Sequence, residues 1–186
     1  AILDSIVDKG LQYELAMKHG VPTAKTLFPE SIEALRSVKD DIQFPVFVKG
    51  RSGHLWADEF KSKGFLAKDY SELEGIIDRA LKANLKPLIQ ELIIGPNANH
   101  FKICAYYSKE KKMLAVFSTQ KARQYPVDFG VGTFMVSKKM PELTKEAIKF
   151  FESIDYTGVG SIEFKKDDRD GVYKIIELNP RLLSLI

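Results

Sequence analysis

Two alternating segments near the C-terminus, joined by turn-forming residues, constrain the fold of this chain more than any other feature. Residues 161–164 read Ser-Ile-Glu-Phe and residues 173–179 read Tyr-Lys-Ile-Ile-Glu-Leu-Asn, with an Asp- and Gly-rich stretch at 167–171 between them. Side chains alternate between the two faces of a β-strand, so each segment should separate apolar from polar residues. Two such segments on either side of a turn are typical of an antiparallel hairpin.

The polar face of this predicted hairpin carries two carboxylates. With the turn centred near Asp170, Glu163 lies across from Glu177, and Asn179 follows on the same face about 6–7 Å further along the backbone. Facing carboxylates repel each other, and a hard cation such as Mg²⁺ would remove that cost because it binds oxygen ligands. Arg181, one strand step further, suits a phosphate or carboxylate ligand. The alternative is a solvated hairpin with ordinary surface charges, and these two segments alone leave both interpretations open.

Composition excludes several classes of protein. The chain has 186 residues, 45% hydrophobic and 28% charged, which is ordinary for one soluble domain or two small lobes. Its net charge of +3 does not by itself indicate a nucleic-acid surface. A single cysteine, Cys104, excludes an intramolecular disulfide and fits a reducing compartment. No apolar run approaches the ~20 residues of a membrane span, so we expect a cytoplasmic protein without membrane or nucleic-acid partners.

Both ends of the chain suggest that the domain is truncated. The sequence begins Ala1-Ile2-Leu3 without an initiator Met, and it stops within the apolar stretch 181–186. We therefore expect an excised domain or an incomplete gene product.

The N-terminal half reads as helices alternating with buried strands. A first helix, capped by Ser5, is expected to end at Gly20. Residues 44–49 (Phe-Pro-Val-Phe-Val-Lys) form an apolar strand of the kind buried on both faces. The polar segment Gly50–Gly64 is expected to be a loop, and a further helix is expected to begin at a capping box of Ser71 and Glu74.

The C-terminal half reads as strands, one helix and the hairpin. Strand-like segments at 88–94, 101–107 and 113–119 precede a basic segment at 120–126, and a helix begins at Pro141. This order predicts an α+β protein in two lobes.

Four segments, in order, resemble the ATP-grasp superfamily. They are Asp8-Lys9 with Gly20-Val21-Pro22-Thr23, then Phe44-Pro45-Val46-Phe47-Val48-Lys49, then Gln90-Glu91-Leu92-Ile93-Ile94-Gly95, and finally Ser161-Ile162-Glu163-Phe164 with Glu177-Leu178-Asn179-Pro180-Arg181. Each segment is weak evidence alone, but the ordered set runs from Asp8 to Arg181 and is specific. Within the superfamily, the chain is most similar to carbamoyl-phosphate-synthase-like ligases.

The resemblance implies a fold and a division of the chain. ATP-grasp proteins hold ATP between two α+β lobes. Residues 1–20 would be a linking helix left from a missing N-terminal domain, 21–91 the N-terminal lobe, and 92–186 an incomplete C-terminal lobe.

The resemblance also implies nucleotide-binding residues. Lys9 and Lys49 would contact the ATP phosphates, although a surface lysine is the usual alternative. The Gly50–Gly64 loop would fold over the phosphates and donate backbone N–H groups. The adenine edge would follow the hinge, and ribose would contact one of two asparagines. The loop and hinge positions are Gly50, Ser52, Gly53, Gln90, Glu91, Leu92, Ile93, Asn97 and Asn99.

The remaining implied sites concern metal and substrate. Glu163, Glu177 and Asn179 would bind Mg²⁺ or Mn²⁺. Lys121 and Arg123, two apart on one strand face, would bind the substrate carboxylate or the transferred phosphate together with Arg181. A basic surface stripe is the alternative interpretation of that pair.

Two functions follow from the resemblance. One is an ATP-dependent ligase that releases ADP and phosphate while activating a carboxylate, or bicarbonate, as an acyl-phosphate for attack by an amine or other nucleophile. The other is a nucleotide-binding module with a regulatory or structural role. No Ser–His–Asp or Cys–His set competes for the chemistry. Small-molecule carboxylate and nucleophile substrates are the expected partners, and a homodimer is left open.

Overall fold

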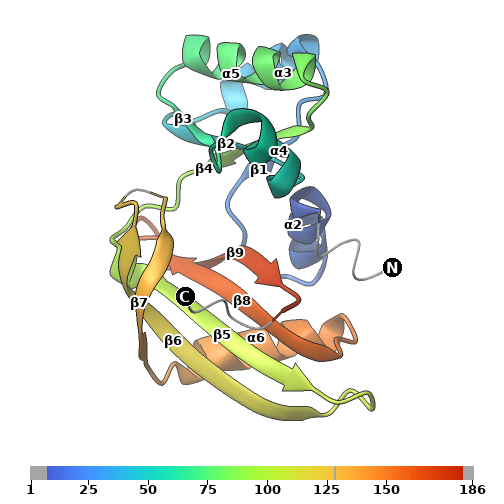
Figure 1. Ribbon diagram of the computed structural model, residues 1–186, viewed down its shortest axis with the longest axis vertical. Helices are drawn as coiled ribbons and strands as arrows, with labels where there is room; N and C mark the ends of the chain where they lie inside the picture. The colour runs from blue at the N-terminus through green and yellow to red at the C-terminus, as the bar shows by residue number, and fades with distance from the viewer. Residues whose placement is uncertain (1–7, 128, 182–186) are drawn as a thin grey trace.

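A computed structural model describes residues 8–127 and 129–181 as two antiparallel sheets, one above the other (Figure 1). The small sheet has the strand order β1-β4-β2-β3, with bounds Thr26–Leu27 (β1), Val46–Gly50 (β2), Phe65–Ala67 (β3) and Pro87–Glu91 (β4). The large sheet has the order β7-β6-β5-β8-β9, with bounds His100–Tyr107 (β5), Met113–Tyr125 (β6), Val131–Ser137 (β7), Gly158–Lys166 (β8) and Tyr173–Asn179 (β9). This confirms the predicted α+β fold class.

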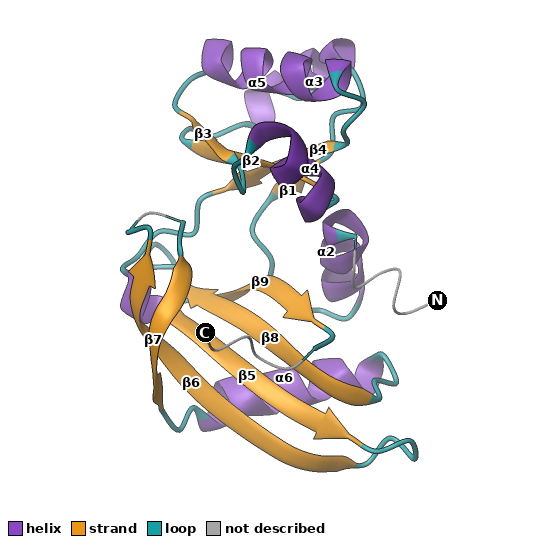
Figure 2. Cartoon of the chain, viewed as in Figure 1, coloured by secondary structure: helices purple, strands orange, loops and turns teal. Residues whose placement is uncertain are grey.

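Each sheet has helices on one face (Figure 2). The helices of the small sheet are α3 (Ile32–Ser37), α4 (Gly53–Phe60) and α5 (Tyr70–Lys82), while α6 (Pro141–Ser153) covers the large sheet and α2 (Lys9–Lys18) lies beside β9. Two hydrophobic cores result, one between each sheet and its helices. Tyr13 and Ala16 of α2 belong to the core of the large sheet.

The first described helix begins later than the sequence suggested. Ser5 lies outside the described residues, and Asp8 is the N-cap of α2, accepting hydrogen bonds from the backbone N–H groups of Gly10 and Leu11 at 2.7 and 3.1 Å. Gly20, at φ +73°, follows the end of α2 as expected.

The prediction of an open loop over Gly50–Gly64 is wrong, because α4 occupies its centre. Trp56 is fully buried and packs against Phe60 and Phe65, with ring centroids 4.8 and 6.0 Å away. An aromatic pair four residues apart lies on one side of a helix, so burying these rings favours helix over loop.

Two further local predictions need correction. The cap of α5 is Asp69, which accepts from the Glu72 N–H at 2.9 Å, in place of the predicted Ser71 and Glu74. Strand β2 buries Val46, Val48 and Gly50 on its core face, while Phe47 and Lys49 on the other face are half-buried and line a cavity. The apolar run therefore did not mean burial on both faces.

Within the part of the chain that the structure describes, no helix is long and apolar enough to cross a membrane.

Candidate active site

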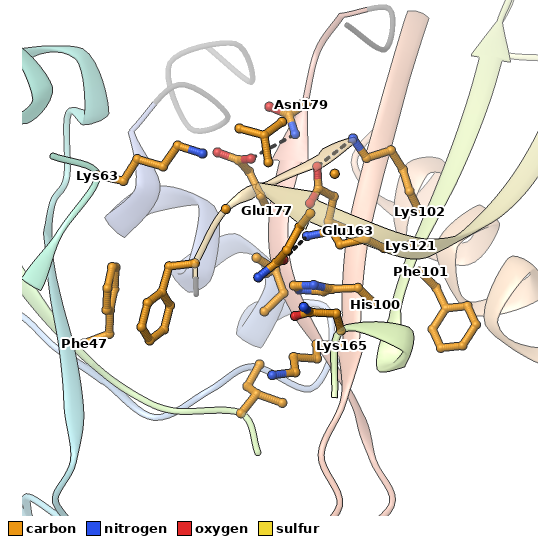
Figure 3. A pocket seen from close by; sticks show the side chains of 18 of the residues that line it. Phe47, Lys63, His100, Phe101, Lys102, Lys121, Glu163, Lys165, Glu177 and Asn179 are labelled. Atoms are coloured by element: carbon orange, nitrogen blue, oxygen red, sulfur yellow. Dashed lines mark hydrogen bonds and ion pairs between the residues drawn. The ribbon is translucent and has the colours of Figure 1, made fainter. Parts of the chain in front are cut away.

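A cavity of about 770 Å³ lies between the two sheets and is lined by both. Its upper wall comes from β2 and β4, and its floor is the face of the large sheet opposite α6. Phe47 of β2 stacks on Phe129 of the β6–β7 connection, with ring centroids 4.5 Å apart, so the two lobes touch at the cavity wall. Figure 3 shows the side chains that converge on this space.

The predicted hairpin places its carboxylates as expected. Glu163 of β8 pairs in register with Glu177 of β9, and a β-bulge between Glu163 and Phe164 sets this register. The row continues across the sheet, because Lys102 pairs with Glu163 and Thr119 pairs with Lys102. All four side chains of the row line the cavity.

Two lysines neutralise the carboxylates in this structure. Lys102 Nζ lies 2.7 Å from Glu163 Oε1, and Lys9 Nζ lies 2.5 Å from Glu177 Oε1. Burial alone would raise the pKa of Glu177, but the Lys9 ammonium and a hydrogen bond from Asn179 hold it at about 2. The sequence argument that a metal would relieve the repulsion between the carboxylates was therefore incomplete, since ammonium groups already relieve it.

The same oxygens suit a magnesium ion. Two facing carboxylates and the Asn179 amide offer hard oxygen ligands on rigid strands. Among the described residues, no group of three or more His, Cys, Asp or Glu side chains could hold a metal by itself. Mg²⁺ is commonly held by one or two carboxylates plus substrate phosphates, and this donor set fits that pattern.

Lys49 is the second cationic centre of the cavity. Its ammonium donates to Tyr13 Oη at 2.9 Å and to Gln90 Oε1 at 3.0 Å, and no described carboxylate forms an ion pair with it. Tyr13 is itself anchored to the Ile176 carbonyl at 2.7 Å. Burial lowers the pKa of Lys49 to about 8, so its ammonium would be stabilised by an anionic ligand.

The hinge between the lobes is held by an ionic network around the buried Asp167 carboxylate. Glu91 accepts from the Lys25 backbone N–H at 2.9 Å and contacts Arg169 and Lys174 at 3.4 and 3.5 Å. Asp167, fully buried, lies 2.5 Å from Arg169 and 2.8 Å from Lys174, and these two cations hold its pKa well below the usual range despite burial. The β8–β9 turn thereby fixes the hinge against the large sheet.

Most of the predicted site residues line the cavity. Those that the structure brings together there are Lys9, Lys49, Gly53, Gln90, Glu91, Leu92, Ile93, Asn97, Lys121, Glu163, Glu177, Asn179 and Arg181.

Four predicted site residues do not line the cavity. A bulge between Lys121 and Arg123 reverses the alternation of β6, so Arg123 is exposed and lies over the Phe134 ring. Asn99 donates to Asp168 Oδ1 at 2.7 Å and so supports the β8–β9 turn. Gly50 is needed for packing, because a Cβ there would lie 2.8 Å from Trp56 Cβ. Ser52 precedes α4, and its hydroxyl lies 3.0 Å from His54 Nδ1.

Several cavity residues were not predicted from the sequence. They come from the polar face of the large sheet and from β2, and they include Phe47, Lys102, Thr119 and Lys165. The alternation of β5 could have indicated Lys102, but only the strand register shows that it lies beside Glu163.

The charge of the lining favours an anionic ligand. Seven lysine and arginine side chains line the cavity against three glutamates. One of those glutamates, Glu91, is already held by Arg169 and Lys174. Such an excess of cations in a concave site attracts phosphates and carboxylates.

Comparisons with known proteins agree with this geometry. The family "Carbamoyl-phosphate synthase L chain, ATP binding domain" matches residues 115–184. The D-aspartate ligase of Enterococcus faecium (strain Aus0004) is 25% identical over 193 residues, covering 97% of this chain and 45% of the relative.

Solved structures match nearly the whole chain. The biotin carboxylase domain of Hydrogenobacter thermophilus 2-oxoglutarate carboxylase, in complex with MgADP, ADP and bicarbonate, superposes with a TM-score of 0.75 at 19% identity, covering 98% of this chain and 41% of that chain. L-amino acid ligase from Bacillus licheniformis superposes with a TM-score of 0.70 at 16% identity, covering 98% and 42%.

The chain has the ATP-grasp fold. The two sheets of its ATP-grasp fold, the hinge and the carboxylate hairpin occur in the order that the sequence motifs predicted. The chain spans less than half the length of these relatives, so the activity of a whole protein is a matter for proposal.

Proposed function

We propose that this ATP-grasp chain carries the nucleotide site of an ADP-forming ligase that joins a carboxylate to an amine. The observation that carries the proposal is the row of Glu163 and Glu177 on the cavity floor, facing Lys49 across a strongly basic cavity. Phosphoryl transfer requires groups that hold metal ions and cations that bind phosphate oxygens. The paired carboxylates of this cavity suit the first task, and its lysines suit the second.

ATP would span the cavity from the hinge to the hairpin. Its adenine would lie along the backbone from Glu91 to Ile93, and Asn97 is the remaining candidate for ribose. Lys49 would contact the phosphates, and Lys9 would join it after leaving Glu177. Gly53 lines the cavity at the first residue of α4, so backbone N–H groups at this helix end would replace those of the predicted loop as phosphate donors.

Glu163, Glu177 and the Asn179 amide would hold Mg²⁺ or Mn²⁺. When bound, the metal would neutralise charge on the phosphate oxygens. Lys9 and Lys102 would then turn from the carboxylates toward the ligand.

The reaction would proceed in two displacements. A carboxylate oxygen of the acid attacks the γ-phosphorus, the bond to the β-phosphate oxygen breaks, and ADP leaves. An amine then attacks the acyl carbon, inorganic phosphate leaves, and the amine loses a proton to solvent. Lys121 and Arg181 would hold the acid, because both line the cavity near the carboxylate row. Positioning and charge neutralisation suffice for this chemistry without a protein nucleophile.

The comparisons suggest which acids to test first. The similarity to a D-aspartate ligase and to an L-amino acid ligase makes amino acids the first acids to test. The similarity to a carboxylase domain solved with bicarbonate adds bicarbonate to the panel. That carboxylase domain was solved as a dimer, so a homodimer is the first assembly to test.

The test is a trapping experiment with the full-length protein, ATP, Mg²⁺, hydroxylamine and a panel of acids that includes D-aspartate and bicarbonate. ADP formed together with the hydroxamate of one acid supports the ligase. AMP and pyrophosphate would overturn the reaction proposed. Tight binding of MgATP without acid-dependent ADP formation would favour the nucleotide-binding module instead.

A further inference from the structure

The floor of the cavity contains buried polar groups that the protein itself leaves without partners. Thr119 is only 5% exposed, yet its hydroxyl has no hydrogen-bond partner among the described residues. Within the same part of the chain, both ring nitrogens of His100 are likewise buried and unpartnered. An unsatisfied buried polar group is destabilising and uncommon in native proteins. Finding such groups together on one wall suggests that a ligand completes them.

A buried ammonium lies beside these groups. Lys121 is 7% exposed, and its Nζ donates a hydrogen bond to the Gln124 amide oxygen at 3.3 Å. No carboxylate of a described residue forms an ion pair with it. Burial lowers the pKa of Lys121, and burial together with three neighbouring lysines lowers that of His100 to about 3, so the imidazole is neutral. The described residues of this wall therefore offer a cation, a hydroxyl and a neutral imidazole, and none of these described groups is an anion.

The strand register relates this wall to the carboxylate hairpin. Thr119 lies in the same row as Glu163 and Glu177, with Lys102 between, and Lys121 follows two residues later along β6. Adjacent strands are about 4.8 Å apart, so Thr119 stands ~10 Å from Glu163 at the backbone. Figure 3 shows His100, Lys102 and Lys121 grouped on this side of the hairpin.

We propose that Thr119, His100 and Lys121 form an oxyanion subsite that receives the carboxylate of the acid to be phosphorylated. The proposal rests on the proposed function and adds two residues, Thr119 and His100, to it. A γ-phosphate held at Glu163 and Glu177 would extend toward β5 and β6, and the attacking oxygen must come within about 3–3.5 Å of its phosphorus. An acid held over Thr119 and Lys121 would be in reach of that phosphorus.

Each group has a separate task in this subsite. The Lys121 ammonium supplies the charge that binds a carboxylate. The Thr119 hydroxyl, after rotation about its χ1 angle, donates one hydrogen bond to a carboxylate oxygen. His100, being neutral, can donate from one ring nitrogen without adding a charge that would compete with Lys121. Thr119 would thus contact the bound carboxylate directly and orient it through this hydrogen bond.

The test compares Thr119→Val with Thr119→Ser in the full-length protein. Valine keeps the shape and removes only the hydroxyl, so the melting temperature should stay equal or rise, because the hydroxyl has no partner in the free protein. With AMP-PNP and Mg²⁺ present, the Kd for D-aspartate or bicarbonate should rise about tenfold or more in Thr119→Val. Thr119→Ser should recover most of the affinity, and Thr157→Val, at an exposed position before β8, should change neither quantity.

The outcomes separate the two levels of proposal. If the wild-type protein fails to bind MgAMP-PNP, the proposed function fails. If it binds MgAMP-PNP and Thr119→Val weakens AMP-PNP but not ADP, the subsite holds the γ-phosphate, which overturns the carboxylate assignment. Thr119→Val that changes the Kd for neither acid, or that lowers the melting temperature by several degrees, rejects the subsite.

Discussion

Replacing Lys102 by methionine should have opposite effects on stability and on metal binding. The Lys102–Glu163 pair is 2.7 Å long, and its side chains are 21% and 20% exposed. Exposed pairs contribute about 0–1 kcal/mol, and breaking a buried pair costs about 3–5 kcal/mol. For this intermediate burial we expect a loss of about 1–2 kcal/mol, which lowers the melting temperature by roughly 2–8 °C.

The same substitution should strengthen metal binding. A divalent ion on Glu163 would lie ~5 Å from the Lys102 ammonium, and Coulomb's law in a water-like medium gives a repulsion of about 1–2 kcal/mol. Removing that repulsion should lower the Kd for Mn²⁺ by about 5–30-fold.

Two measurements on the full-length protein test this reasoning. Mn²⁺ binding would be followed by electron paramagnetic resonance without nucleotide, and melting by calorimetry without metal. Lys149→Met is the matched control, because Lys149 forms an exposed ion pair with Glu146 on α6, far from the cavity. Mn²⁺ affinity that is unchanged or weaker in Lys102→Met would refute the idea that Lys102 and the metal compete for Glu163.

Three further predictions follow from the cavity. Glu177→Gln should weaken Mn²⁺ binding at least tenfold in the same titration, whereas Glu146→Gln should leave it unchanged; equal effects would remove Glu177 from the metal site. The pKa of Lys49 is lowered to about 8, so its ammonium is lost as pH rises through that value. The Kd for MgADP should therefore increase from pH 7 to 9, and Lys49→Met should abolish this slope; a flat wild-type profile contradicts the role. Arg123→Ala should change the KM of the acid by less than twofold, because Arg123 lies over Phe134 outside the cavity; a tenfold increase would restore its predicted role.

The sequence predicted the hairpin well because local patterns determine it. Alternation on both sides of a polar turn was enough to place Glu163 opposite Glu177. A turn centred near Asp170 was enough to predict the pairing of Glu163 with Glu177. It did not predict the β-bulge between Glu163 and Phe164. The order of the four motifs then gave the fold class, since each marks one fixed element of the two lobes.

The errors arose where a single extra residue or a tertiary contact decides the geometry. The bulge in β6 places Arg123 away from Lys121. No residue type in that segment indicates a bulge. The helix α4 forms because Trp56 is buried against Phe60 and Phe65, which outweighs the loop-like glycines around it. Thr119 and Lys102 could not be assigned to the site because strand register is a non-local property.

The account's central claim is that an oxygen of the acid attacks the γ-phosphate of ATP. The most direct measurement uses the full-length protein, MgATP and acids labelled with oxygen-18 in their carboxylates, with the phosphate products examined by phosphorus NMR. The account predicts that turnover places one labelled oxygen in inorganic phosphate and none in ADP. Label appearing in AMP, or unlabelled phosphate released during acid-dependent turnover, would contradict it.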